Sequence, residues 1–158
     1  ACGDMLVNVE IKNSADEAGY DPTVAVAELT IAVMRKHGDA SRSIISSFDW
    51  ATVQRCRELA PDVMTAYLVM NATAELIEQT AAAGHAAVHP WEPTIDQAMV
   101  DRCHGAGIAI NAWTCNDSQR LQELATMGVD GACTDVPDVA LIALGRRISP
   151  AAQWGTRA

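Results

Sequence analysis

Apolar and polar residues alternate through the stretch LVNVEIKN, residues 6–13. Because successive side chains of a strand point to opposite faces, Val7, Val9 and Ile11 share one face of a predicted strand. The opposite face carries an amide, a carboxylate and an ammonium: Asn8, Glu10 and Lys12. This pattern fits two interpretations, a solvated strand face with a Glu–Lys pair or the mouth of an active site.

The chain as a whole repeats one unit, a short apolar strand followed by an amphipathic helix. Six strands are predicted, at residues 5–11, 42–48, 63–69, 85–90, 108–113 and 129–135. Six helices follow them, at residues 21–38, 49–61, 71–84, 94–107, 116–128 and 136–147. Residues that favour a helix start stand at Asp21, Pro22, Asp49 and Asn71. Glycines that favour a helix end stand at Gly38 and Gly84.

Strands that alternate with helices over such short links predict a parallel sheet with right-handed crossovers. Two architectures share this order of elements, an open doubly wound sheet and an eight-stranded (β/α) barrel, and periodicity does not choose between them. No linker divides residues 1–148, so we predict a single domain. Residues 149–158 are predicted to form a C-terminal surface tail.

Both architectures bind ligands at the carboxyl ends of their strands. Polar and aromatic residues gather at these predicted ends, at Glu10, Lys12, residues 46–49, Tyr67, residues 89–92, residues 113–117, Thr134 and Asp135. The opposite ends consist mostly of helix-ending glycines and small or apolar residues. This asymmetry predicts a functional site at the carboxyl ends.

Composition agrees with a globular domain, since 49% of the residues are hydrophobic and 4% are aromatic. No run of about 18 apolar residues predicts a membrane span, and no signal-peptide pattern is present. With a net charge of −9 the chain is a poor general binder of nucleic acid, whereas a small anionic substrate remains compatible with a local positive site. The five cysteines show no zinc or disulfide spacing, so we expect reduced, mostly buried thiols.

Motifs of the common nucleotide-binding loops and of the serine nucleophile elbow are absent from the sequence. The four histidines have no metal-ligand spacing. We interpret His37, His85 and His104 as structural, because they lie near helix ends or begin a strand. His89 ends a predicted strand beside Pro90 on the ligand side, and it too is interpreted as structural.

Three segments, in order along the chain, resemble the glycerophosphodiester phosphodiesterase family: VNVEIKN, IISSFDW and NAWTCNDSQRLQELATMGVDGACTDVPDV. The last segment is the most specific. It resembles the family pattern of Trp-Thr-Val-Asn, a helix, Gly-Val-Asp-Gly, Thr-Asp and Pro-Asp, with Cys115 in place of the usual Val. The resemblance extends from about residue 5 to residue 145, nearly the whole chain.

This resemblance implies a parallel TIM-type (β/α) barrel, of which the chain carries six of the eight strand–helix units. It implies that Glu10 is a metal ligand for Ca²⁺ or Mg²⁺ and that Lys12 contacts the substrate phosphate. Trp113 is implied as a flat apolar wall for the alcohol part of a glycerophosphodiester substrate. A hard divalent cation prefers carboxylate oxygens, and a phosphodiester anion is attracted to both the cation and an ammonium.

Other family motifs are missing, namely His-Arg-Gly, Glu-Asn-Thr, Glu-x-Asp and His-Asp of the first two strand–helix units. The chain therefore offers no residue for the catalytic acid and base roles, and only one of the three metal carboxylates. We expect a fragment that begins at the third strand of the barrel, and we expect it to be inactive alone. The intact enzyme would hydrolyse glycerophosphodiesters to sn-glycerol 3-phosphate and an alcohol.

Two alternatives to this hypothesis stay open. The first is a non-catalytic partial barrel that serves as a binding or assembly module, with its open edges covered in an oligomer. The second is a relative with phospholipase D-like chemistry on the same barrel. The expected partner is a small-molecule substrate without nucleic acid or a membrane span, and the expected location is the cytoplasm.

Overall fold

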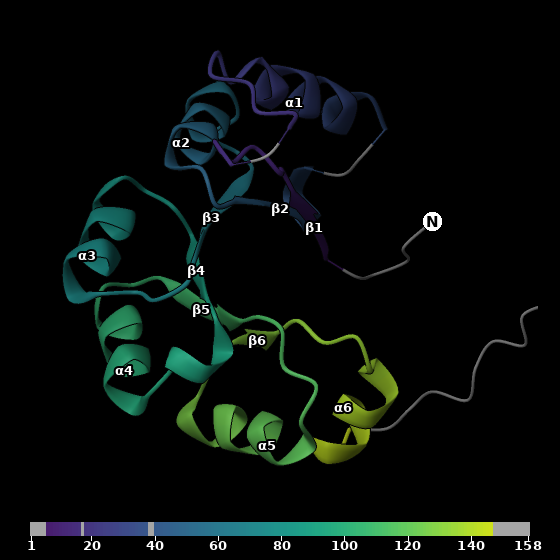
Figure 1. Ribbon diagram of the computed structural model, residues 1–158, viewed down its shortest axis with the longest axis vertical. Coiled ribbons are helices and arrows are strands. Elements are labelled where there is room, and N and C mark those ends of the chain that lie inside the picture. The colour runs from purple at the N-terminus through teal and green to yellow at the C-terminus, as the bar shows by residue number, and fades with distance from the viewer. Residues whose placement is uncertain (1–5, 17, 38–39, 147–158) are drawn as a thin grey trace, which may run out of the picture.

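A single parallel sheet organises the molecule, which is a computed structural model that describes residues 6–16, 18–37 and 40–146. The six strands lie in chain order, β1-β2-β3-β4-β5-β6. Their bounds are β1 (Val7–Glu10), β2 (Ser43–Ser47), β3 (Met64–Val69), β4 (Ala87–Pro90), β5 (Ala109–Ala112) and β6 (Gly131–Ala132). Figure 1 shows that the sheet curls into an open ring, with β1 and β6 at its two edges.

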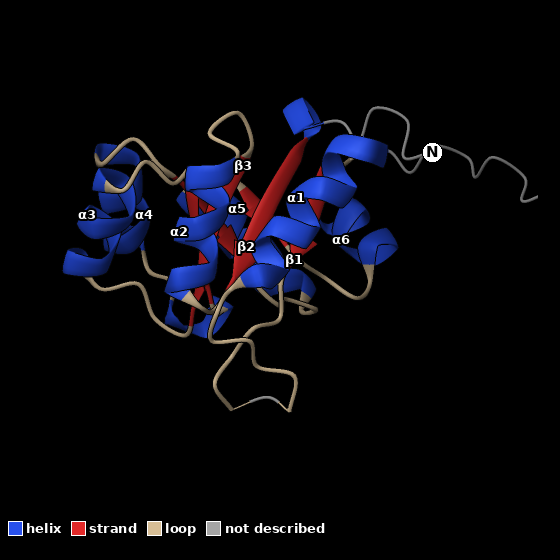
Figure 2. Cartoon of the chain, turned by 90° about the horizontal axis from the view of Figure 1, so that it is seen from above, coloured by secondary structure: helices blue, strands red, loops and turns tan. Residues whose placement is uncertain are grey.

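A helix follows each strand and lies on the outer, convex side of the curl (Figures 1 and 2). The helices are α1 (Ala25–His37), α2 (Trp50–Leu59), α3 (Ala74–Ala82), α4 (Gln97–Gly105), α5 (Ser118–Met127) and α6 (Pro137–Ala143), with short 3₁₀ helices η1 (Ala40–Arg42) and η2 (Glu92–Thr94). Helices on one face only, around a curled parallel sheet, identify a partial (β/α) barrel and exclude the doubly wound alternative. The predicted barrel with six strand–helix units is confirmed.

Two apolar clusters fill the space between the sheet and the helices. One joins β1, α1, β2 and α2 around Ile11, Ile31 and Ile45, and the other joins the later units around Ile77 and Ile110. Cys56, Cys103 and Cys115 are buried free thiols, which confirms their interpretation as small core residues. No helix in the described part of the chain is long and apolar enough to cross a membrane.

Some predicted element bounds are wrong because side chains compete for the helix starts. The Asp21 carboxylate accepts hydrogen bonds from the backbone N–H groups of Thr23, at 2.9 Å, and Val26, at 3.2 Å. It therefore stabilises a turn, and α1 begins at Ala25 instead of Pro22. At α3 the N-cap is Thr73 instead of the predicted Asn71.

The last predicted strand is also shorter than expected. The prediction covered residues 129–135, whereas β6 pairs with β5 only at Gly131 and Ala132. Backbone hydrogen bonds continue this contact from Asp130 to Ile110 and from Cys115 to Cys133. Beyond Cys133, Thr134 and Asp135 bond to the side chain of Asn116 instead of a strand, so the ladder ends. The predicted helix end at Gly38 and the predicted tail lie outside the described residues.

Candidate functional site

The inner face of the sheet carries a row of small side chains with one carboxylate at its edge. Glu10 pairs with Ser46, and the row continues through Ala66, Ala87 and Ala109. Paired residues of parallel strands point to the same face, so all five side chains lie on the concave side of the sheet. Glu10 is exposed at the edge of this row, whereas Ser46, Ala66 and Ala87 are buried.

Lys12 lies two residues beyond Glu10, so it faces the same side one step nearer the carboxyl ends of the strands. The residues before and after Lys12 fix its backbone from the outer side of the sheet. Ile11 lies in the apolar core, and the Asn13 amide donates to Thr52 Oγ1 at 2.9 Å. Within the described residues, the side chains of Glu10 and Lys12 form no hydrogen bond or ion pair. Both predicted site residues are therefore exposed, on a held backbone, and available to a ligand.

Glu10 by itself does not make a cation site. Among residues 6–16, 18–37 and 40–146, no group of three or more His, Cys, Asp or Glu side chains is placed to hold a metal ion. Ca²⁺ and Mg²⁺ need several oxygen ligands at once. The described residues therefore do not fit the complete metal site that the family resemblance implies.

Trp113 directly follows β5 and is held in place by contacts with β4 and with the residue that follows β2. Its indole N–H donates to the backbone carbonyl of His89 at 2.7 Å. The Phe48 ring, which follows β2, meets the Trp113 ring edge to face, with centroids 5.2 Å apart and planes at 89°. β2 and β5 are separated by two strands in the sheet, so this contact spans the concave side of the curl.

His89 is buried on the inner face below Trp113. Asn111 Nδ2 lies 2.9 Å from His89 Nε2, so a donating amide places the ring proton on Nδ1. Burial lowers the pKa of His89 to about 4, which keeps the ring neutral at pH 7. Gly131 leaves room for Asn111, because a Cβ at that position would lie 2.5 Å from Asn111 Oδ1. These contacts agree with the interpretation of His89 as structural, and the structure adds that its carbonyl holds the indole of Trp113.

The Trp-Thr-x-Asn and Thr-Asp motifs meet at the ends of β5 and β6. Asn116 donates from its side chain to Asp135 Oδ2 at 2.9 Å and accepts from the Asp135 backbone N–H at 2.8 Å. The Thr134 hydroxyl also donates to Asn116 Oδ1 at 3.1 Å. The side chains of these motif residues join the loop after β5 to the loop after β6. In the sequence, the order and spacing of the two motifs indicated the family, but not this contact.

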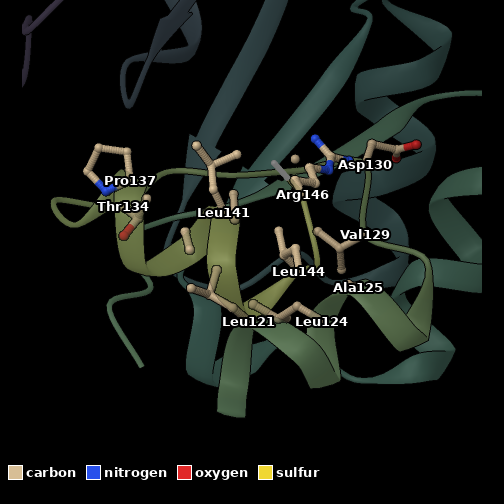
Figure 3. A pocket seen from close by; sticks show the side chains of 13 residues that line it. Leu121, Leu124, Ala125, Val129, Asp130, Thr134, Pro137, Leu141, Leu144 and Arg146 are labelled. Atoms are coloured by element: carbon tan, nitrogen blue, oxygen red, sulfur yellow. The ribbon is translucent and has the colours of Figure 1, made fainter. Parts of the chain in front are cut away.

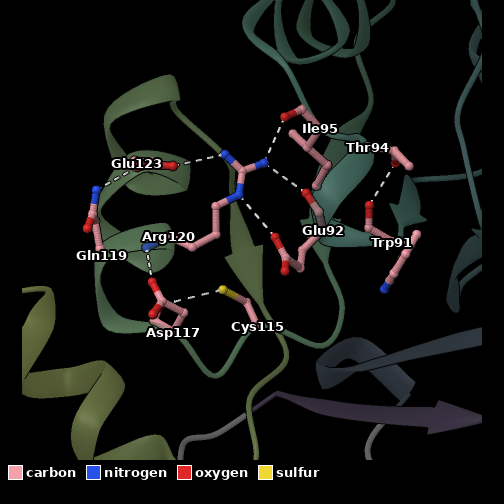
Figure 4. A network of polar contacts seen from close by, with 9 residues as sticks. All are labelled: Trp91, Glu92, Thr94, Ile95, Cys115, Asp117, Gln119, Arg120 and Glu123. Carbon is pink, nitrogen blue, oxygen red and sulfur yellow. Dashed lines mark hydrogen bonds and ion pairs between the residues drawn. The ribbon is translucent and has the colours of Figure 1, made fainter.

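Arg120 on α5 is a residue that the sequence reasoning missed (Figure 4). Its guanidinium forms an ion pair with Glu92 Oε2 at 3.0 Å and donates to the backbone carbonyls of Glu92 and Ile95, both at 2.8 Å. The loop that it holds follows β4 and begins with Trp91, whose backbone forms a bridge with Trp113. Arg120 therefore holds the loop at the mouth of the site from the outer layer.

An apolar cavity of about 400 Å³ lies away from this mouth, among α5, β6 and α6 (Figure 3). Its lining includes Leu121, Leu124, Leu141 and Leu144, with Asp130 and Arg146 at one side. The cavity contains neither Glu10 nor Lys12 nor Trp113. It is a feature of the edge of the sheet and is separate from the candidate site.

The sequence model of the glycerophosphoryl diester phosphodiesterase family matches residues 4–139. This match covers most of the chain and includes Glu10, Lys12 and Trp113. The chain belongs to this family. A curated family relative, the glycerophosphodiester phosphodiesterase of Caldanaerobacter subterraneus subsp. tengcongensis, is 27% identical over 144 residues, which cover 91% of this chain and 57% of the relative. The chain thus spans about half the length of the curated relatives it matches.

Solved structures confirm the fold of this family member. An Oleispira antarctica phosphodiesterase, in complex with the product sn-glycerol-3-phosphate, superposes with a TM-score of 0.79 at 21% identity, covering 90% of this chain and 56% of that one. A glycerophosphodiester phosphodiesterase from Parabacteroides distasonis gives a TM-score of 0.75 at 22% identity, covering 89% and 57%. Identities this low establish a shared fold.

Acid sensitivity is the first testable consequence of the site. The folded-state pKa of His89 is about 4, below the ordinary value of 6.5, so protonation favours the unfolded chain. Stability should be unaffected by this group above pH 6.5 and should fall as the pH drops toward 4, with a loss of about 2 kcal/mol near pH 5. Urea unfolding across this range should show a smaller decrease for His89→Gln than for the unmodified chain. His104→Gln, on the surface, should retain the full decrease.

Removal of the Arg120 network should destabilise the fold. Arg120→Met leaves the Glu92 carboxylate, whose side chain is 19% exposed, without its cation. It also removes the guanidinium donor of the Ile95 carbonyl and one of the two donors of the Glu92 carbonyl, which keeps the backbone N–H of Ile95. We expect a loss of about 2–3 kcal/mol in the free energy of unfolding. The matched control is Arg55→Met on α2, where the ion pair with Glu28 is exposed to solvent and its loss should change little. Equal effects in urea titrations of both variants would contradict the role assigned to Arg120.

Proposed function

We propose that this chain is the substrate-binding part of a metal-dependent glycerophosphodiester phosphodiesterase. The enzyme would hydrolyse glycerophosphodiesters to sn-glycerol 3-phosphate and an alcohol. The observation that carries the proposal is the placement of Glu10 and Lys12 on one inner face, at the ligand end of a barrel of this family. The Oleispira relative holds sn-glycerol-3-phosphate, which supports a substrate of this class.

Lys12 is proposed to bind the phosphate of the substrate. Its ammonium is exposed and, within the described part of the chain, unengaged, while Ile11 and Asn13 hold the strand on either side. An ammonium at a fixed backbone position attracts a phosphodiester and strengthens its hydrogen bonds. Trp113 is proposed to contact the alcohol part of the substrate, as a wall whose orientation is held by His89 and Phe48.

A Ca²⁺ or Mg²⁺ ion is proposed as cofactor, with Glu10 as one of its ligands. The described residues lack the further carboxylates that such an ion needs, so we derive no step through the metal from this chain. They also lack an exposed histidine beside Glu10 and Lys12 for proton transfer, since His89 is buried and bonded to Asn111. We therefore propose that the chain is part of a longer enzyme and is inactive by itself.

A second candidate, an assembly module, is favoured by apolar side chains near both edges of the sheet. On α1, Leu29 and Val33 are 68% and 61% exposed and lie one turn apart, and on α6 Ile142 is 66% exposed. Contact through α1 would give a dimer in sedimentation experiments, and Leu29→Lys with Val33→Lys would restore the monomer. A monomer at all concentrations would argue against this candidate.

The test of the main proposal uses hydrolysis of glycerophosphocholine with added Ca²⁺ or Mg²⁺. The purified chain should release no glycerol 3-phosphate, and the longer protein from the natural source should release it. In that longer protein, Lys12→Met should lower kcat/KM about 10- to 100-fold, because a charge-assisted hydrogen bond contributes about 1.5–3 kcal/mol.

Lys36→Met is the matched control, since Lys36 is exposed in the last turn of α1. It should leave kcat/KM unchanged. Release by the 158-residue chain alone would contradict its proposed inactivity, and no release by the longer protein would contradict the enzymatic function.

A further inference from the structure

The hydroxyl group of Ser47 joins the end of β1 to the end of β2. Ser47 is fully buried, and its Oγ donates to the backbone carbonyl of Ile11 at 2.7 Å. The same Oγ accepts from the backbone N–H of Asp49 at 3.1 Å. Because a serine hydroxyl has a single proton, the bond from Asp49 leaves that proton for the Ile11 carbonyl. We call this series of bonds, from Asp49 through Ser47 to Ile11, the Ser47 path. It ends at the peptide bond that precedes Lys12.

The Ser47 path stands where the ladder between β1 and β2 stops. The last paired residues are Glu10 and Ser46, and the Ile11 N–H donates to the Ser46 carbonyl at 2.8 Å. In a ladder that continued, the N–H of Phe48 would be the next donor to the Ile11 carbonyl. The Ser47 hydroxyl fills this place, so β2 turns into α2 while the end of β1 stays bonded.

A second series of hydrogen bonds, the Thr52 path, holds the residue after Lys12. The Asn13 amide donates to Thr52 Oγ1 at 2.9 Å, and the Thr52 hydroxyl donates to the Asp49 carboxylate. Asn13 Oδ1 accepts from the backbone N–H of Asp21 at 2.8 Å, which fixes the orientation of the amide. Asn13 and Thr52 are both buried. The two paths meet at Asp49, the N-cap of α2.

Lys12 lies between these two attachments and points the other way. Ser47 and Asn13 act from the outer side of the sheet, whereas Lys12 faces the concave side. A lysine ammonium stands on a flexible four-carbon stem, so its reach depends on the position and direction of its Cα–Cβ bond. The Ser47 path fixes the carbonyl before Lys12, and the Thr52 path fixes the residue after it. Together they fix the base of the Lys12 side chain.

We propose that Ser47 is a positioning residue for Lys12. Its hydroxyl, oriented by Asp49, holds the backbone from which the Lys12 ammonium reaches the phosphate of the substrate. Ser47 touches no substrate, because it is buried on the outer side of the sheet. The inference rests on the proposed function for the phosphate, whereas the positioning of the backbone is measured without any substrate.

The first measurement is the mobility of the Lys12 backbone in the purified chain, from ¹⁵N relaxation in NMR spectra. Ser47→Ala takes this donor away from the Ile11 carbonyl, so the heteronuclear NOE of the Lys12 amide should fall. Ser47→Cys keeps a side chain of similar shape with a weaker donor and should give an intermediate value. Thr80→Val is the matched control, because it removes an equally buried hydroxyl that donates to the Leu76 carbonyl on α3. It should leave the Lys12 signal unchanged.

The second measurement is a double-mutant cycle on kcat/KM in the longer protein, with glycerophosphocholine as substrate. Ser47→Ala should lower kcat/KM about three- to tenfold, because a displaced contact group loses part of its effect. In the Lys12→Met background the same change should have almost no further effect, since no ammonium is left to position. A merely structural role would lower kcat/KM by the same factor in both backgrounds. Thr80→Val should leave kcat/KM unchanged in both.

Thr52→Val tests the second path and keeps the inference open to refutation if a Ser47 variant does not fold. Valine has nearly the volume of threonine but no hydroxyl, so the Asn13 amide loses this acceptor. We expect a lower NOE at Lys12 and the same dependence of kcat/KM on the presence of Lys12. Urea unfolding of each variant verifies that it is folded under the conditions of both measurements.

The outcomes separate this inference from the proposed function. An unchanged Lys12 NOE in the folded variants, or an equal decrease of kcat/KM with and without Lys12, would overturn the positioning role of Ser47. Hydrolysis by the unmodified longer protein would still support the enzymatic function in that case. A lower Lys12 NOE together with no hydrolysis by the unmodified longer protein would support the positioning of the backbone and overturn the enzymatic function.

Discussion

The close curl of the sheet depends on small side chains along its inner face. Ser46, Ala66, Ala87 and Ala109 form one row across four strands, beside Glu10 at the edge. A parallel sheet curls only as far as its concave side chains allow, because that side has the smaller radius. With small residues in this row, Phe48 and Trp113 meet across two intervening strands. The mouth of the candidate site is a consequence of this curl.

Polar contacts in the loops hold the backbone beside the side chains that are proposed to face a ligand. Asn13 ties the end of β1 to α2, Asn116 joins the ends of β5 and β6, and Arg120 holds the loop after β4. Lys12 and Trp91 lie next to these anchors and remain exposed. This division of roles is what a binding site needs, since ligand-contacting groups act best from fixed backbone positions.

The proposed chemistry is distributed around a barrel, and this chain carries one part of it. The proposed phosphate binding by Lys12 and the proposed alcohol contact by Trp113 need only side chains that follow β1 and β5. Cation binding and proton transfer need further groups, because Glu10 is one carboxylate and His89 is neutral and bonded to Asn111. In barrels of this type, catalytic residues come from the ends of several different strands. The proposed requirement for a longer chain follows from this arrangement.

The sequence by itself determined the local features: the alternation of Val7, Val9 and Ile11, the N-cap at Asp49, and the order of six strand–helix units. These depend on neighbours a few residues away, so a linear pattern carries them. Periodicity left the choice between an open sheet and a barrel undecided, and only the family resemblance implied the barrel. The tertiary structure alone decided which distant groups meet, such as Arg120 with Glu92 and His89 with Asn111. Those contacts depend on strand register and curl, which set distances between residues more than 20 positions apart.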